Sequence, residues 1–464
     1  MSSKRIVYNE QEKTYSLRSG RIEAVIGDEK QSGEFYPRLK LKVWDNESNL
    51  SVGLITTEAE RENALVKQEN DDILWRKEGL EARFYPLPVT QQYEEGGYEF
   101  KIVLHERPLS NILPFSINTL KELKFCYQRP LTEDEKRRGW YQPENVVGSY
   151  AVYHASKGNV HRNPEEAEKY KAGKAFHIFR PWAEDSKGNR VWCDLNIDEQ
   201  AEMLTITTPQ KFIEEAIYPI TIDPTFGCTT IGSMEGPGLL GSKASLMGAV
   251  GSIRTGSAFD GVDGKLVSIH YATYGSFFSS SPPPVPKNIS NIDIRLMVNE
   301  EDAVDCEHPE VERVEDIVDF PATPAWQSTD LSGNVTITAE KRYILNAMAD
   351  YTSLDDGDML FIMGDMNISG GAVYTGNSFI TDYEGGATDP WIDNTPIPDA
   401  VLSIYCTYEE VGSDETYQGE AVLTSVTSSH VSGRKLARAS APIIANLASA
   451  ESAEKIAKGL FYVS

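Results

Sequence analysis

Alternation of apolar and polar residues recurs along most of this chain and limits the folds open to it. Segments 39–43, 98–104 and 292–298 each carry apolar side chains at every second position. A period of two turns one face of a strand toward a core and the other toward water. Turn sequences such as EEGG, before Tyr98, separate these segments. The sequence therefore predicts a mainly β fold of antiparallel sheets, with short helical insertions.

The chain has 464 residues, more than one hydrophobic core usually serves. No repeated β–α–β alternation is present, which disfavours a Rossmann or TIM architecture. An aliphatic strand stops at Asp223-Pro224 in the phrase YPITIDPT, and we expect a domain boundary there. Four regions are predicted: a β-sandwich at 1–150, a β-hairpin extension packing on it at 151–225, a jelly-roll-like β-sandwich at 226–410 and a tail at 411–464.

Few segments predict helices. The clearest is NPEEAEKYKAG, with Asn163 as N-cap, Pro164 at the first helical position and Gly173 as terminator. Segments 57–67 and 338–350 are further helix predictions. The sequence DSKGN, between two apolar stretches, predicts a hairpin turn.

The formal charge of −26 repels nucleic-acid phosphates and anionic membranes, so we expect a partner of neither kind. No apolar run is long enough to span a membrane, and the first residues lack the apolar core of a signal peptide. The five cysteines are scattered without a C-x-x-C pair, so neither disulfides nor a zinc site are expected.

Acidic loops in the third region offer oxygen ligands of the kind that calcium prefers. They supply Asp355, Asp356 and Asp358 in LDDGDML, and Asp365 in GDMN. Ordinary Asp-Gly turns are commonplace and are the favoured explanation of the same residues. Apart from calcium, no cofactor is predicted. His154, His161 and His177 are read as structural, hydrogen-bonded residues, with a shared metal as the alternative.

The tail reverses the charge of the rest of the chain. From Arg434 to Lys458 it carries five basic residues and two acidic ones, among Ala and Ser. The tail has too few large apolar groups to offset the conformational entropy that it would lose on ordering alone. We therefore expect it to order by docking on an acidic partner. The predicted docking residues are Arg434, Lys435, Arg438, Ile443, Ile444, Lys455 and Lys458.

Three groups of residues resemble known proteins. YPITIDPT is similar to the phrase that closes β modules in large bacterial surface proteins, such as wall-associated and rearrangement-hotspot proteins. GYEFKIVLHERPLSN, ENVVGSYAVYHASKGN and KAFHIFRPWAEDSKGNRVWCDLNID resemble uncharacterised proteins of tailed bacteriophages and prophages. The order GSIRTGSAFD, NIDIRLMVNE, AWQSTDLSGNVTITAEKRYIL resembles jelly-roll modules of surface and virion proteins. Together these resemblances cover about residues 80–408.

The resemblance implies a non-enzymatic structural component of a phage virion: a tail-fibre or adsorption part, a neck or collar part, or a capsid decoration. Its partners would be other virion proteins and copies of itself, on a virion exterior assembled in the bacterial host cytoplasm. One alternative is a carbohydrate-binding adhesin module for a host-surface glycan, favoured if Trp326, Trp391 or Tyr383 lies exposed on a concave face. The other is a glycan-degrading hydrolase, which requires two close carboxylates in unequal environments within a cleft.

Overall fold

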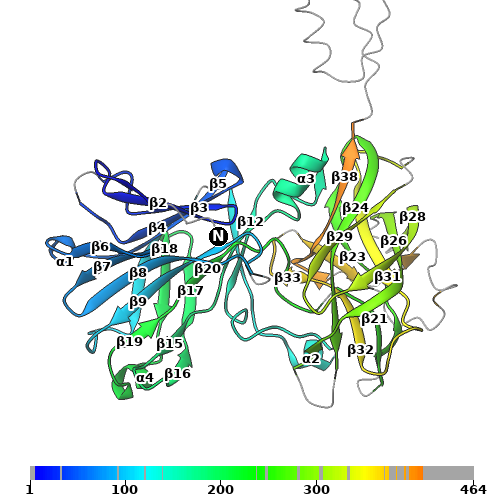
Figure 1. Ribbon diagram of the computed structural model, residues 1–464. Coiled ribbons are helices and arrows are strands. Elements are labelled where there is room, and N and C mark those ends of the chain that lie inside the picture. The colour runs from blue at the N-terminus through cyan, green and yellow to red at the C-terminus, as the bar shows by residue number, and fades with distance from the viewer. Residues whose placement is uncertain are drawn as a thin grey trace, which may run out of the picture. The chain divides into compact units, whose positions relative to one another are not determined.

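The computed structural model confirms a mainly β protein with sandwich-like sheets and short helices (Figure 1). Residues 1–409 form one compact unit. The structure describes residues 6–410 except 32–33, 91–92, 120–121, 138, 237, 246–248, 279–282, 302–306, 332–334, 370, 376–382, 384–390 and 393–396. The described helices are α1 (Glu58–Arg61), α2 (Glu133–Arg137), α3 (Pro164–Tyr170), α4 (Gln210–Glu215) and the 3-10 turn η1 (Trp44–Asn46).

Two sheets make up what we call the first sheet system, and a common apolar core that includes Trp75, Phe84 and Phe100 lies between them. One is eight-stranded, in the order β1 (Val7–Asn9), β2 (Thr14–Ser19), β3 (Ile22–Ile26), β4 (Arg38–Val43), β5 (Ser48–Leu54), β10 (Ile112–Thr119), β18 (Met203–Thr207) and β17 (Asp194–Asp198). Alternation works as predicted in β4, where Leu39 and Leu41 are buried and Lys40 is only half-buried.

The other sheet of the first system has eleven strands. Its main path is β11 (Leu123–Tyr127), β12 (Tyr150–His154), β14 (Lys174–Ile178), β20 (Thr225–Gly227), β9 (Gly97–Leu104), β19 (Ile220–Ile222), β15 (Trp182–Glu184) and β16 (Arg190–Trp192). Three further strands continue from β9: β8 (Leu80–Leu87), β7 (Asp72–Lys77) and β6 (Leu65–Glu69).

Strands from residues 151–225 are built into both sheets of the first system. β18 pairs with β10, and β14 pairs with β12. β20, which begins two residues after Asp223, still pairs with β9 and β14. The first sheet system therefore includes the Asp223-Pro224 phrase and extends to Gly227, because β20 lies between β14 and β9 in the sheet.

The second sheet system comprises the sheets built from residues 239–409 together with the short strand β13. Its nine-stranded sheet contains β38 (Ile404–Glu409), β24 (Gly264–Phe277), β32 (Asp358–Ile362), β21 (Leu239–Ala244), β22 (Ala249–Ser252), β25 (Val285–Pro286), β29 (Ala325–Asp330), β30 (Thr336–Ile337) and β13 (Val160–His161). Its six-stranded sheet is β28 (Glu310–Phe320), β26 (Ile289–Glu300), β31 (Arg342–Ala349), β23 (Thr255–Asp260), β34 (Ala372–Thr375) and β36 (Ile397–Pro398).

Two short ladders complete the second system: β27 (Glu307–His308) with β35 (Trp391–Ile392), and β33 (Gly364–Met366) with β37 (Ala400–Leu402). One apolar core, with Leu296, Phe320 and Ile404 among its buried residues, joins strands of both large sheets. β13 comes from the first half of the chain but belongs to the nine-stranded sheet, because its Val160 pairs in parallel with Cys406 of β38.

Two helix predictions need correction. Segment 338–350 forms strand β31, whose residues after Arg342 are all buried between β23 and β26. A strand covered on both faces needs no alternation, so its Leu, Ala and Met content resembles that of a helix. Segment 57–67 is helical only over α1, where Thr57 and Glu60 form a capping box, and then continues into β6.

The helix at NPEEAEKYKAG and the hairpin at DSKGN are confirmed, although the helix ends at Tyr170 with Lys171, and not Gly173, as its C-cap. Asn163 caps α3 by accepting a hydrogen bond from the Glu166 amide, and Pro164 opens the helix. β15 and β16 pair across DSKGN. Among the described residues, no helix is long and apolar enough to cross a membrane.

Candidate functional site

A fully buried ion pair joins the two sheet systems. Lys174 Nζ, on β14, lies 2.8 Å from Asp365 Oδ2, on β33, and neither side chain is exposed. Lys174 also donates to the Ile231 carbonyl at 3.0 Å and to Ser233 Oγ at 2.9 Å. Asp365 accepts from the Tyr153 hydroxyl at 2.8 Å and from the Ser233 amide at 3.0 Å. The ammonium and the carboxylate therefore have their hydrogen-bonding capacity satisfied within the protein.

His177 extends this buried network. Its Nε2 lies 2.7 Å from Ser149 Oγ, and its Nδ1 lies 3.0 Å from Ser233 Oγ. Burial lowers the pKa of His177 well below its usual value, and the positive charge of Lys174 lowers it further. The ring is therefore neutral, and it serves as a hydrogen-bonded link.

The three histidines predicted as structural each have separate partners. His161 Nε2 bonds to the Lys171 carbonyl, and His154 Nε2 lies 3.2 Å from Glu122 Oε2. Across the part of the chain that the structure describes, no group of three His, Cys, Asp or Glu residues is arranged to hold a metal ion.

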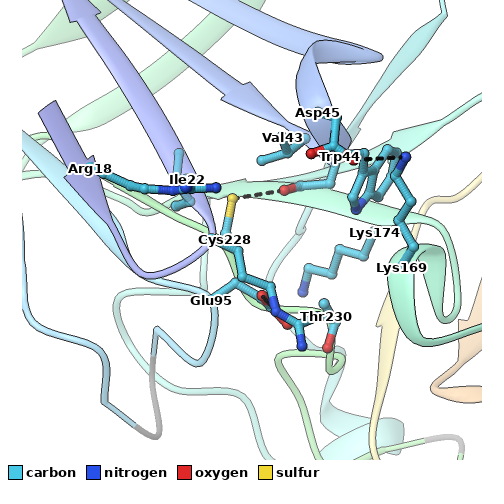
Figure 2. A pocket seen from close by; sticks show the side chains of 12 residues that line it. Arg18, Ile22, Val43, Trp44, Asp45, Glu95, Lys169, Lys174, Cys228 and Thr230 are labelled. Carbon is cyan, nitrogen blue, oxygen red and sulfur yellow. Dashed lines mark hydrogen bonds and ion pairs between the residues drawn. The ribbon is translucent and has the colours of Figure 1, made fainter. Parts of the chain in front are cut away.

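A cavity of ≈170 Å³ opens beside Lys174, between strands of both sheets of the first system (Figure 2). Figure 2 shows Arg18 entering from one side and Trp44, Asp45 and Lys169 from the opposite side. The cavity lining combines four cations, two carboxylates and one indole, a mixture suited to a small polar ligand. The full lining is Arg18, Arg21, Ile22, Val43, Trp44, Asp45, Glu95, Lys169, Lys174, Ala175, Cys228 and Thr230.

A second, open groove of ≈510 Å³ carries the predicted Trp326 in its lining. The indole is half-buried, its Nε1 donates to Thr230 Oγ1 at 3.0 Å, and its ring lies 5.1 Å from that of Tyr405. Thr230 also lines the first cavity, so this residue connects the two. The groove is lined by Val89, Thr90, Glu94, Thr323, Pro324, Ala325 and Trp326.

The other two aromatic candidates differ from Trp326. Tyr383 is buried, with the Arg295 guanidinium 4.4 Å from its ring centroid, so it is not an exposed platform. Trp391 belongs to β35, but its side chain lies outside the described residues.

Three of the four predicted calcium ligands pair with one of two lysines. Lys287 Nζ lies 3.1 Å from Asp355 and 2.6 Å from Asp358, and Lys174 pairs with Asp365. Asp356 instead accepts a hydrogen bond from the Ser245 amide at 3.1 Å. Calcium at Asp355, Asp356 and Asp358 requires displacement of the Lys287 ammonium, and it stays a prediction.

Alternation placed Glu99 on the polar face of its strand, but the structure buries it to 4 % exposure next to Asp223. Thr225 Oγ1 donates to both Glu99 carboxylate oxygens at 3.0 Å. Burial, and then the negative charge of Asp223 and the hydrogen bond to it, raises the pKa of Glu99 to about 9. Glu99 is therefore protonated at neutral pH and shares its proton with the Asp223 carboxylate, whose Oδ1 also lies 4.0 Å from Lys101 Nζ.

Sequence reasoning missed the Lys174–Asp365 pair and the Glu99–Asp223 pair. Each joins residues that are more than a hundred positions apart, and no spacing motif marks them. The predicted docking residues Arg434, Lys435, Arg438, Ile443, Ile444, Lys455 and Lys458 lie outside the described residues.

Comparisons with known proteins assign no family. No protein-family model and no curated protein match the chain. Among solved structures, one similarity is to the GH31 alpha-xylosidase from Xanthomonas citri, at 7 % identity over 78 % of this chain and 35 % of that chain. This chain thus spans about a third of the xylosidase's length. The TM-score is 0.10, too low to support an inference about fold or activity.

Proposed function

We propose that this chain is a non-enzymatic structural component on the exterior of a tailed-phage virion, acting through protein–protein assembly. As a tail-fibre or adsorption part, a neck or collar part, or a capsid decoration, it would contact other virion proteins and copies of itself. The observation that supports this proposal is the buried Lys174–Asp365 pair, which fixes one sheet system on the other.

Sheet systems joined by an ordinary interface move against each other by default. Here the buried charges are paired and hydrogen-bonded, an arrangement that rigidifies a core. Gln128 adds to the same junction, because its Nε2 donates to the Met366 carbonyl at 2.7 Å and its Oε1 accepts from the Met366 amide at 3.0 Å. A rigid building block holds its neighbours at fixed spacing, as particle assembly requires.

The basic tail is the proposed attachment to neighbours. Deletion of 430–464 should leave the fold intact but abolish incorporation into particles, measured by immunoblotting of sedimented particles from complemented lysates. Circular dichroism checks folding. A matched full-length variant, with Arg434, Lys435, Arg438, Lys455 and Lys458 all changed to Gln, tests whether charge is the cause. If the deletion variant enters particles as the full chain does, docking by the tail is wrong. If the full chain is also absent from washed particles, the virion proposal is wrong.

Glycan recognition is a second candidate, favoured by the position of Trp326 in the open groove. Glu94 lies in the same groove with its Oε1 held by the Thr230 and Ile231 backbone amides, which fixes a carboxylate beside the indole. An aromatic face next to fixed polar groups is typical of small-molecule sites. Trp326→Ala should abolish retention on a host-surface glycan array, and Trp326→Phe should retain part of it. Equal retention by Trp326→Ala would exclude this groove.

A further inference from the structure

The cavity beside Lys174 has the size of a small-ligand site. Its ≈170 Å³ far exceeds the roughly 15 Å³ that one water molecule requires. Residues that line it come from β2, β3, η1, α3 and β14, so parts of the chain that are distant in sequence form its wall (Figure 2).

Of the four cations that line this cavity, Arg18 is the one whose charge is available to a ligand. Arg21 pairs with Glu95 and Glu168, Lys169 with Asp45 and Glu47, and Lys174 with Asp365. Arg18 is exposed, and the structure shows no ion pair for it with any described residue. A guanidinium presents paired N–H donors that match the two oxygens of a carboxylate.

Trp44 forms the opposite wall and is held rigidly. Its ring packs at 5.2 Å, edge to face, against Tyr170 and at 5.8 Å against His154. The turn that carries it has three successive non-glycine residues of positive φ: Trp44 at 53°, Asp45 at 56° and Asn46 at 68°. Such backbone is strained and persists where its surroundings enforce it, often at ligand sites. The turn places the indole and the exposed Asp45 carboxylate side by side.

These three groups are complementary to one class of molecule. A carboxylate fits Arg18, hydroxyl donors fit the acceptor capacity that the exposed Asp45 carboxylate keeps beside Lys169, and the apolar face of a sugar ring fits the indole of Trp44. A simple inorganic anion would use Arg18 alone and be repelled by Asp45. We propose that the cavity binds a single acidic monosaccharide unit, with its carboxylate on Arg18 and its ring against Trp44. This proposal rests on glycan recognition as the second candidate function, and adds a site separate from the Trp326 groove.

Isothermal titration of the full chain with glucuronic, galacturonic and N-acetylneuraminic acids tests the proposal. At least one should bind saturably, glucose at least about tenfold more weakly, and rising salt should weaken the acid's binding. Arg18→Gln should weaken the acid's binding by about tenfold or more. The matched variant Arg137→Gln removes an exposed arginine of α2, which is not in the cavity lining, and should bind as the wild type does.

Three results would overturn the assignment: no binding of any acid, glucose binding as tightly as the acids, or inorganic phosphate competing equally and depending equally on Arg18. Trp44→Leu, checked for folding by circular dichroism, should weaken the sugar acid's binding but leave acetate binding unchanged. If Trp44→Leu weakens the binding of neither the sugar acid nor acetate, a sugar site is also contradicted. Glycan-array retention through Trp326 and incorporation into particles are measured in separate experiments. The acidic-sugar proposal can therefore fail while the glycan groove and the virion role are both supported.

Discussion

Lys174 Nζ and Asp365 Oδ2 lie 2.8 Å apart, with both side chains fully removed from solvent. The two residues belong to different sheet systems and lie 191 positions apart in the sequence. The free energy of this contact therefore acts at the junction between the systems and not within either core.

Changing Lys174 to Met should lower the free energy of unfolding by about 3 kcal/mol or more, because it leaves the Asp365 carboxylate charged and unpaired in the interior. The double variant Lys174→Met/Asp365→Asn should recover part of this loss, since the amide is neutral, its oxygen can still accept from the Ser233 backbone and its nitrogen can donate to the Tyr153 hydroxyl oxygen. Urea denaturation measures the free energy of unfolding of the single and the double variant. Lys211→Met, which removes an exposed lysine near Glu215, is the control and should change little. A single variant as stable as the wild type would show that the pair does not hold the junction.

The thiols should be unreactive in the native protein. Cys126, Cys193, Cys228 and Cys406 are free and buried, and burial raises the pKa of Cys193 to about 11. Since the thiolate is the reactive form, a thiol reagent at pH 8 should label none of these four before denaturation. In denaturant without reductant, all five cysteines of the chain should react. A count of three would reveal a disulfide and contradict the prediction.

The fold class could be predicted because alternation survives wherever one face of a sheet meets water, as in β4 with Leu39, Lys40 and Leu41. The prediction failed where strands are buried on both faces. The residues of β31 favour a helix by composition, yet Ile344, Leu345, Ala347 and Met348 are all enclosed in a sheet. Local propensity cannot report such enclosure, which depends on neighbours far along the chain.

Candidate site residues were harder to predict, for a related reason. The sequence GDMN around Asp365 resembles a calcium-ligand loop, but the cation beside this carboxylate is Lys174. Trp326, one of three aromatic candidates named from the sequence, lies half-buried on β29 and lines the open groove. Nothing in the sequence around Arg18 or Trp44 indicates that they face one cavity.

His177 should make stability fall as the pH drops below about 6.5, the ordinary pKa of an imidazole. Its pKa is lowered in the folded state, so below that pH the unfolded chain binds a proton that the folded protein does not. Thermal melts of the wild type and His177→Gln between pH 7.5 and 5 isolate the effect as the difference between the two curves. That difference should shrink with falling pH, as the wild type loses its advantage. A constant difference would mean that His177 is not kept neutral by the fold.

Glu99 should act at the other end of the pH scale. Its folded pKa, about 9, lies above its ordinary value of 4.5, so the folded protein holds a proton that the unfolded chain releases. The stabilisation from this proton is complete below about pH 4.5, declines as pH rises and is lost near pH 9. Glu99→Gln keeps a neutral donor toward Asp223, so its melting temperature should fall less than that of the wild type between pH 6 and 10, by roughly 5 °C.

Glu199→Gln, a change at an exposed turn residue, is the matched control and should follow the wild type at every pH. Tyr85 and Tyr93 cannot mimic the effect at pH 6–9, because burial raises the pKa of Tyr93 to about 12 and that of Tyr85 further. Glu235 contributes a similar loss near pH 7, since burial raises its pKa to about 7, but that contribution is common to wild type and variant and cancels in their difference. If Glu99→Gln and the wild type lose stability in parallel up to pH 10, the shared proton at Asp223 does not exist. Asp223 in the phrase YPITIDPT would then be an ordinary carboxylate.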